Sequence, residues 1–147
     1  MATDATERPS PKNSIRPRVT NMDHIVLRVR DIDASLDFYT QVLGLEGELV
    51  EEFRAGSAPF PLVRINERTI IDLFPSPEME PIGGDSRNQD HFCLAIEPTD
   101  MSELLAHFLA QGIRVREGPV RRSGARGQAD SIYIFDPDDN VVEIRCY

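Results

Sequence analysis

Apolar and polar residues alternate over short runs that occur in the same order in both halves of the chain. Residues 24–29 alternate with a period of two and have apolar side chains at the odd positions, which predicts a strand. Residues 33–43 carry apolar side chains at helical spacing, and Gly44 predicts the end of that helix. Turn residues then separate three further predicted strands, at residues 47–53, 62–65 and 69–74.

The second half of the chain repeats this plan. Residues 91–96 alternate in the same way, and Asp100 with Glu103 predicts the start of a helix. Three more strands are predicted, at residues 113–117, 131–135 and 141–146. Each half is therefore a βαβββ module whose single helix covers one face of its sheet. We predict an α+β fold in which two modules, about residues 22–80 and 89–147, form a cupped, mostly antiparallel sheet with the helices on the outer face.

The two halves also share a pattern of polar residues. A histidine that follows an aspartate opens the first strand of each half, at His24 and His91, and the last strand of each half carries one carboxylate, at Asp72 and Glu143. Strand parity places all four on the concave face, opposite the more apolar face that the helices cover. A pseudo-twofold arrangement would bring two imidazoles and two carboxylates together, and divalent metal ions bind such sets.

Residues 1–20 differ in composition from the rest of the chain. They hold three Pro, no aromatic residue and four basic against two acidic side chains, which cannot bury enough apolar surface to offset the entropy of ordering. We expect a disordered tail followed by a folded domain over residues 21–147. The chain carries a net charge of −9, and residues 21–147 carry −11, from 12 Arg and 23 acidic side chains. Such a field repels phosphate backbones, so nucleic acid is not an expected partner.

Length and apolar content limit the number of domains and the expected location of the protein. The 147 residues suit one compact domain or two small modules that share a core. No apolar run approaches the roughly 20 residues of a membrane span, and the first residues lack the apolar core of a secretory signal. The expected location is therefore the cytoplasm, without a membrane partner. Cys93 and Cys146 form no disulfide framework and have no CxxC partner, so both are expected to pack.

Three stretches, taken in this order, form a set of motifs. They are Met22-Asp23-His24-Ile25-Val26-Leu27 with Asp37-Phe38-Tyr39 and Leu43-Gly44-Leu45, then Asp90-His91-Phe92, and then residues 131–143 with the turn Asp136-Pro137-Asp138-Asp139-Asn140. Together they resemble the vicinal oxygen chelate superfamily, which includes glyoxalase I, bleomycin resistance proteins, fosfomycin resistance enzymes and extradiol dioxygenases. Residues 117–127 with 131–133 also resemble the glyoxalase domain-containing protein 5 subgroup, a narrower likeness that gives no substrate.

The resemblance implies that His24, His91 and Glu143 bind a divalent metal ion, with Mn, Fe, Ni, Zn and Mg all open. Two imidazoles and one carboxylate would leave coordination positions for adjacent oxygen atoms of a small substrate. Glyoxalase I has a further Glu at the position of Asp72. Because Asp is one methylene shorter, Asp72 could reach the metal through water, act as a base, or do neither. Asp72 and Glu143 are the candidate catalytic residues.

Five arginines are concentrated in residues 114–126. They are Arg114, Arg116, Arg121, Arg122 and Arg126. A run of charges usually forms a solvated face, which is the interpretation we favour. The alternative is that a Gly-hinged loop at residues 124–127 closes over the cup and offers Arg126 to an anionic group of the substrate. By resemblance to the fosfomycin resistance enzymes, Ser131 and Tyr133 are candidate substrate contacts beside Arg126.

Three classes of function fit these residues. The leading prediction is a metal-dependent enzyme of glyoxalase type, which acts on a small molecule with adjacent oxygen atoms by lyase, isomerase, fosfomycin-type transferase or hydrolase, or dioxygenase chemistry. The alternative is a metal-free binding protein of the bleomycin resistance type, and a scaffold role is third. In the resembling family, modules pair within one chain or between chains. We predict a homodimer in which His24 and Asp72 of one chain meet His91 and Glu143 of the other.

Overall fold

A computed structural model of the chain describes residues 18–80 and 89–147. Most of the tail predicted over residues 1–20 lies outside these two ranges. Within them, no helix is both long enough and apolar enough to span a membrane.

The first module forms a four-stranded sheet. Its elements are β1 (His24–Val29), α1 (Ile32–Asp37), the π-helical turn η1 (Phe38–Val42), β2 (Glu46–Glu48), α2 (Val50–Arg54), β3 (Leu62–Asn66) and β4 (Thr69–Pro75). The strand order is β1-β4-β3-β2. β1 runs parallel to β4, whereas the β4-β3 and β3-β2 pairs are antiparallel.

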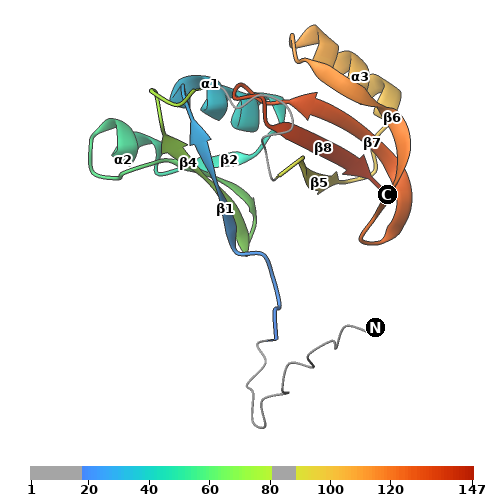
Figure 1. Cartoon of the computed structure of the whole chain (residues 1–147), viewed down its shortest axis with the longest axis horizontal. Coiled ribbons are helices and arrows are strands. Elements are labelled where there is room, and N and C mark those ends of the chain that lie inside the picture. The colour runs from blue at the N-terminus through green and yellow to red at the C-terminus, as the bar shows by residue number, and fades with distance from the viewer. Residues whose placement is uncertain (1–17, 81–88) are drawn as a thin grey trace, which may run out of the picture.

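The second module repeats this topology. Its elements are β5 (Phe92–Ile96), α3 (Met101–Ala110), β6 (Val115–Gly124), β7 (Gly127–Phe135) and β8 (Val141–Cys146). The strand order is β5-β8-β7-β6, with β5 parallel to β8. Figure 1 shows the two sheets as separate units, with α1 between them and α3 over the second sheet. The predicted α+β fold of two modules is confirmed.

Local sequence signals account for the helix ends. The carboxylate of Asp31 accepts a hydrogen bond from the backbone N–H of Ala34 at 3.0 Å and caps α1. Asp100 caps α3 in the same way, as its spacing predicts, by accepting from the N–H groups of Ser102 and Glu103. Gly44 follows η1 with a φ of 73°, a left-handed conformation that ends the helix as predicted.

One predicted strand is wrong. Of residues 47–53, only the first two pair with β3, and the chain then turns at Leu49, which has a φ of 58°. The following residues form the helix α2, in which Arg54 donates to Glu51 one turn earlier at 3.1 Å. Val50 and Phe53 are three residues apart, a spacing that suits one helical turn as well as it suits an irregular strand.

The strands β6 and β7 are longer than predicted. They form one antiparallel hairpin in which Gly124 pairs with Gly127 across a two-residue turn. Arg121 pairs with Asp130 across the hairpin, and Ser123 accepts a hydrogen bond from Gln128 at 2.6 Å. The stretch that the alternative interpretation describes as a Gly-hinged loop, residues 124–127, is therefore a tight turn, because polar side chains pair along both strands up to the tip.

A buried polar contact joins the two modules. Tyr39 in η1 is fully buried and donates its hydroxyl to Asp136 at 2.7 Å, in the turn between β7 and β8. Arg30, just before α1, donates to Asp138 in the same turn at 3.0 Å. Burial, and then the charge of Asp136, raise the pKa of Tyr39 well above its usual value, which keeps its hydroxyl a donor. Tyr39 belongs, with the buried residues Leu36 and Phe38, to one apolar core that includes residues of both sheets.

Candidate metal centre

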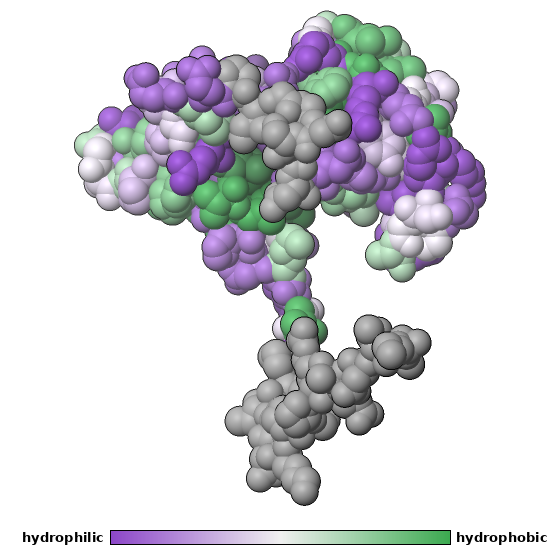
Figure 2. All heavy atoms as spheres, in the orientation of Figure 1, coloured by the Kyte–Doolittle hydropathy of each residue, from purple (hydrophilic) through white to green (hydrophobic). Residues whose placement is uncertain are grey.

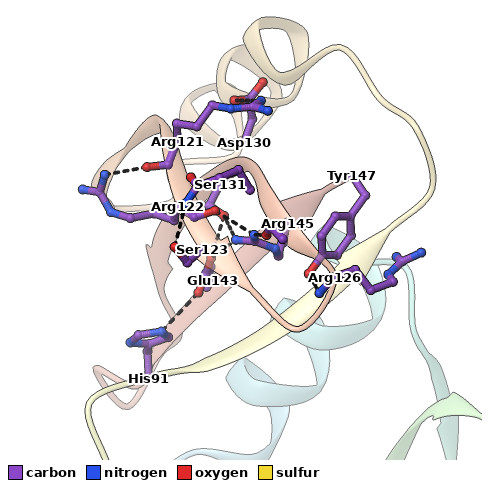
Figure 3. Close-up of polar contacts among 12 residues, drawn as sticks. His91, Arg121, Arg122, Ser123, Arg126, Asp130, Ser131, Glu143, Arg145 and Tyr147 are labelled. Carbon is purple, nitrogen blue, oxygen red and sulfur yellow. Dashed lines mark hydrogen bonds and ion pairs between the residues drawn. The ribbon is translucent and has the colours of Figure 1, made fainter.

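Glu143 lies at the middle of β8, between Cys93 of β5 and Tyr133 of β7. Only 5% of its surface is exposed, and its two carboxylate oxygens have different neighbours. Oε1 accepts hydrogen bonds from the Ser131 hydroxyl at 2.5 Å and from Nη1 of Arg145 at 3.3 Å, whereas Oε2 lies 3.1 Å from Nε2 of His91 (Figure 3). One oxygen is thus held by the protein, and the other faces an imidazole.

His91 is oriented by the residue before it. Its Nδ1 lies 2.6 Å from Oδ2 of Asp90, and the edge of its ring meets the Tyr133 ring with centroids 5.2 Å apart. If Nδ1 carries the proton and donates it to Asp90, Nε2 presents its lone pair to Glu143 Oε2. Two lone pairs that converge at such a distance suit a cation between them, and a carboxylate behind the imidazole is the usual support of a metal-bound histidine.

The first module carries the same arrangement at its own positions. His24 opens β1, and its Nδ1 lies 2.7 Å from Oδ1 of Asp23, the residue before it. Asp72 lies on β4 opposite Val26, two residues along β1 from His24, on the same face of the sheet. Leu27 and Val29 point to the other, buried face, so the predicted parity is confirmed for β1.

Electrostatics distinguish the two carboxylates. Burial raises the pKa of Asp72, and the nearby His24 offsets part of that rise. Burial acts on Glu143 in the same direction, but the hydrogen bond from Ser131 and the proximity of His91 and Arg145 outweigh it and lower the pKa of Glu143. Glu143 is therefore the stronger candidate for a permanently charged ligand, and Asp72 is the better candidate to exchange a proton.

The four predicted residues form two pairs rather than one cluster. His24 and Asp72 share the first sheet, and His91 and Glu143 share the second. In residues 18–80 and 89–147, no group of three or more His, Cys, Asp or Glu side chains is arranged to hold a metal ion. One chain therefore presents two pairs of candidate ligands, each with one imidazole and one carboxylate, and we call each pair a half-centre. Their donor set fits a borderline or hard divalent ion, provided that the two halves meet.

The predicted substrate contacts lie in different places. Ser131 is fully buried and Tyr133 is 8% exposed, and both contact members of the Glu143 half-centre. Arg126 lies at the tip of the β6–β7 hairpin, where its guanidinium stacks on the Tyr147 ring at 4.1 Å. Ser131 already donates to Glu143, so a role for it in contacting a substrate stays a prediction.

The other arginines of this stretch are paired with acids. Each has a carboxylate partner on the protein, and the pairs are Arg114–Asp139, Arg116–Asp90, Arg121–Asp130 and Arg122–Glu117. Arg126 has no such partner within the described residues. Four of the five arginines therefore fit the expected solvated face, and Arg126 is the exception.

Sequence reasoning did not assign a role to Arg145. It lies two residues after Glu143 on the same face of β8, is only 2% exposed, and donates from Nη1 to both Glu143 and Ser131. Strand parity places Arg145 on the same face of β8 as Glu143. A guanidinium buried on the face of a candidate ligand is the signal that could have identified it, because buried Arg side chains are almost always paired.

The family model for the glyoxalase/bleomycin resistance protein/dioxygenase superfamily matches residues 21–144. The chain is 34% identical to the virulence protein STM3117 of Salmonella typhimurium, over 91% of this chain and 89% of that protein. It is also 34% identical to the glyoxalase domain-containing protein RDO1 of Mycosarcoma maydis, over 88% of this chain and 69% of that protein. A solved structure of a glyoxalase/dioxygenase from Nostoc punctiforme covers 90% of this chain and is itself covered to 98%, with 26% identity and a TM-score of 0.71. The chain belongs to the glyoxalase/bleomycin resistance protein/dioxygenase superfamily.

Proposed function

We propose that the protein is a metal-dependent enzyme that acts on a small molecule with adjacent oxygen atoms. The observation that carries this proposal is the convergence of His91 Nε2 and Glu143 Oε2 at 3.1 Å, with the other nitrogen of the imidazole held by Asp90. A divalent ion bound there would polarise the substrate oxygens as a Lewis acid. The narrower likeness to the glyoxalase domain-containing protein 5 subgroup stays part of this proposal.

We further propose that each complete centre forms between two chains. One imidazole and one carboxylate in each sheet make half of a ligand set, and a twofold axis would join the first sheet of one chain to the second sheet of its partner. The face of the first sheet supports this arrangement. Val26, on the same face as His24, is 44% exposed, and Figure 2 shows an apolar patch in the region of β1. A partner chain would cover that patch.

Asp72 is the residue we assign to proton transfer. Its side chain is buried, its pKa is raised, and Leu62 lies opposite it on the neighbouring strand β3. A carboxylate in such an apolar setting is a stronger base than one in water, which suits removal of a proton from carbon or oxygen beside the bound oxygens. Ser131 and Arg145 hold Glu143 in place, so we assign Glu143 to binding the metal ion rather than to proton transfer. Proton transfer of this kind favours a lyase or isomerase reaction.

We expect His91→Ala to lose bound metal. The change removes the nitrogen that faces Glu143 and leaves a single donor in that half-centre. Because the loss of an outer-shell partner alone weakens metal binding about 10-fold to 100-fold, the loss of a ligand should weaken it by more than about 100-fold. Metal content after purification and calorimetric titration with Mn, Fe, Ni, Zn and Mg ions give the measurement.

His107→Ala is the matched control, because His107 is an exposed residue of α3 and belongs to neither half-centre. It should bind metal as the unchanged protein does. Full metal content in His91→Ala would rule out the centre proposed here, and absence of metal binding by the unchanged protein would favour the metal-free binding role instead.

We expect Asp72→Asn to abolish turnover while leaving the fold and most of the bound metal in place. The amide keeps the volume of the carboxyl group but has no basicity, so an enzyme that uses Asp72 for proton transfer should lose about 100-fold or more in kcat. Turnover and metal content are measured on the same preparation. Asp33→Asn, an exposed acid on α1, serves as the control. Unchanged turnover would assign Asp72 a structural role, and a parallel loss of metal would make it a ligand.

A further inference from the structure

Arg145 is a buried cation whose two terminal nitrogens face different parts of the molecule (Figure 3). Nη1 donates to the Ser131 hydroxyl at 3.2 Å and to Oε1 of Glu143 at 3.3 Å. Nη2 donates to the carbonyl oxygens of Arg122 at 2.7 Å and Gly127 at 2.6 Å, one on each strand of the β6–β7 hairpin. The guanidinium therefore connects the candidate ligand Glu143 to the hairpin.

The tip of the hairpin rests directly on this guanidinium at Gly124. A Cβ atom at that position would lie 2.5 Å from both Nε and Cζ of Arg145 and 2.7 Å from its Nη2. The backbone of Gly124 is not left-handed, so glycine supplies room there rather than conformational freedom. The Tyr147 ring also packs on the guanidinium, with its centre 4.7 Å from Cζ. Any displacement of the tip must therefore move Arg145 as well.

Stability alone does not account for this arrangement. Nε is buried and has no hydrogen-bond partner within the described residues. An unpaired donor on a buried cation costs free energy, and an apolar pair is often at least as stable as a buried ion pair in the same place. Phe74, two residues after Asp72 on β4, holds the equivalent position in the first module. Its ring packs against Phe60 with centroids 4.3 Å apart, so the module can be built without a buried arginine at this position.

The contacts of Arg145 fix the orientation of the Glu143 carboxylate. Oε1 accepts from both the Ser131 hydroxyl and Nη1 of Arg145, which uses the two lone-pair sites of that oxygen. Oε2 is left to face Nε2 of His91 at 3.1 Å. Rotation of the carboxylate would break both hydrogen bonds to Oε1. Glu143 can therefore offer a metal ion one oxygen, in one direction, as long as Arg145 stays in place.

We propose that Arg145 is a positioning residue through which the tip of the β6–β7 hairpin holds Glu143 in its orientation toward His91. A planar guanidinium can serve acceptors on two sides at once, which the point charge of a lysine ammonium cannot do. The inference rests on the proposed function, because the orientation of Glu143 matters only where Oε2 and His91 share an ion. A shift of the hairpin tip then weakens the centre although every ligand is still present.

The first test uses the full chain freed of metal with a chelator, so that it does not depend on metal binding. Gly124→Ala presses a methyl group against Arg145 and leaves Glu143 and His91 unchanged. The protein has three histidines, and the ring nitrogen resonances of His91 are identified by their absence in His91→Ala. Glu143→Gln gives the direction in which these resonances move when the carboxylate is lost. At the same pH, we expect Gly124→Ala to move them in that direction.

A double-mutant cycle shows whether the effect passes through Arg145. The side chain in Arg145→Ser ends before Nε, so a methyl group at position 124 has no guanidinium to displace. In that background Gly124→Ala should cause no further shift, because the two changes act on one contact. Arg145→Lys is the second variant should Gly124→Ala fail to fold. It keeps the charge but cannot pair with Glu143 and with the hairpin carbonyls together, so it should shift the His91 resonances in the same direction.

The second test measures the affinity for zinc ions by calorimetry at one protein concentration. Gly124→Ala should weaken zinc binding about 10-fold to 100-fold, the range for loss of a group that orients a metal ligand. Ser123→Ala is the matched control, because it changes the neighbouring residue and removes the hydrogen bond from Gln128, which does not involve Arg145. It should leave both the His91 resonances and the zinc affinity as they are in the unchanged protein.

Three results would overturn the proposal. The first is that the His91 resonances do not respond to Gly124→Ala, and the second is that they respond equally with and without Arg145. The third is that Ser123→Ala weakens zinc binding as much as Gly124→Ala does. The proposed enzyme fails in a different way. If the unchanged protein binds no divalent ion and the His91 resonances respond as expected, Arg145 keeps its positioning role and the metal-dependent function is refuted.

Discussion

Chains that carry His24→Ala and chains that carry Glu143→Gln should each fail to bind metal as homodimers, and a mixed dimer of the two should regain one metal ion. The reason is the division of donors between the two sheets. If the first sheet of one chain completes the second sheet of its partner, one of the two centres in the mixed dimer receives both changes and the other receives none. The intact centre should bind metal with the affinity of the unchanged protein.

The measurement requires two affinity tags, so that mixed dimers can be isolated after the two variants are unfolded and refolded together. Metal content per mixed dimer should be half that of the unchanged dimer. Glu143→Gln is chosen because the amide oxygen can still accept from Ser131 and Arg145, which keeps the buried arginine partnered. Circular dichroism of each parent verifies that neither change unfolds the chain.

A mixture of His91→Ala with Glu143→Gln provides the control. Both changes fall in the second sheet, so each centre of that mixed dimer contains one of them, and no metal should return. If the first mixture also stays empty, each centre is built within one chain and the composite arrangement is wrong. If both mixtures regain metal, the residues that hold the ion are not these.

The largest expected effect on stability comes from Asp136→Ala. Only 2% of Asp136 is exposed, and its carboxylate accepts four hydrogen bonds: from the Tyr39 hydroxyl, the backbone N–H groups of Asp138 and Asn140, and the side-chain amide of Asn140. Alanine would leave these buried donors without an acceptor. Because each buried donor left without an acceptor costs about 1 to 3 kcal/mol and several donors lose theirs together, we expect the free energy of unfolding to fall by at least about 3 kcal/mol.

Urea denaturation gives the measurement, and two further variants locate the effect. Tyr39→Phe removes only the hydrogen bond from Tyr39 to Asp136 and should lower the free energy of unfolding by about 1.5 to 3 kcal/mol, the range for a hydrogen bond to a charged group. Asp130→Ala removes an exposed acid of β7 and should change it by less than about 0.5 kcal/mol. A loss in Asp136→Ala no greater than in Asp130→Ala would show that the turn does not hold the modules together.

Much of the architecture could be predicted because period and parity are local properties of the chain. The strands at residues 24–29 and 141–146 begin and end as their alternation predicts. The helix caps follow from Asp100 and Gly44, whose side chains or backbone freedom act within a few residues. Parity also placed His24 and Asp72 on one face of the first sheet, because neighbouring strands share their faces.

The remainder depended on contacts between distant parts of the chain. In the sequence Arg145 is an ordinary polar residue of a strand. Only the fold shows that the hairpin tip at Gly124 covers it. The hydrogen bond from Tyr39 to Asp136 joins residues 97 positions apart in the sequence, so no local pattern predicts it. Duplication alone shows which positions are equivalent and not which of them meet in one chain. The division of the four candidate ligands into two pairs was expected only through the homodimer prediction, which rests on the family resemblance.

If each centre forms between two chains, as proposed above, metal affinity depends on protein concentration. By mass action, a centre assembled from two chains dissociates on dilution, and each sheet of an isolated chain then offers the ion one imidazole and one carboxylate. The converse follows from thermodynamic linkage: an ion that binds the assembled pair more tightly than the single chain must strengthen the association by the same factor. The metal ion would then stabilise the dimer as well as take part in the reaction, and its removal by a chelator would separate the subunits.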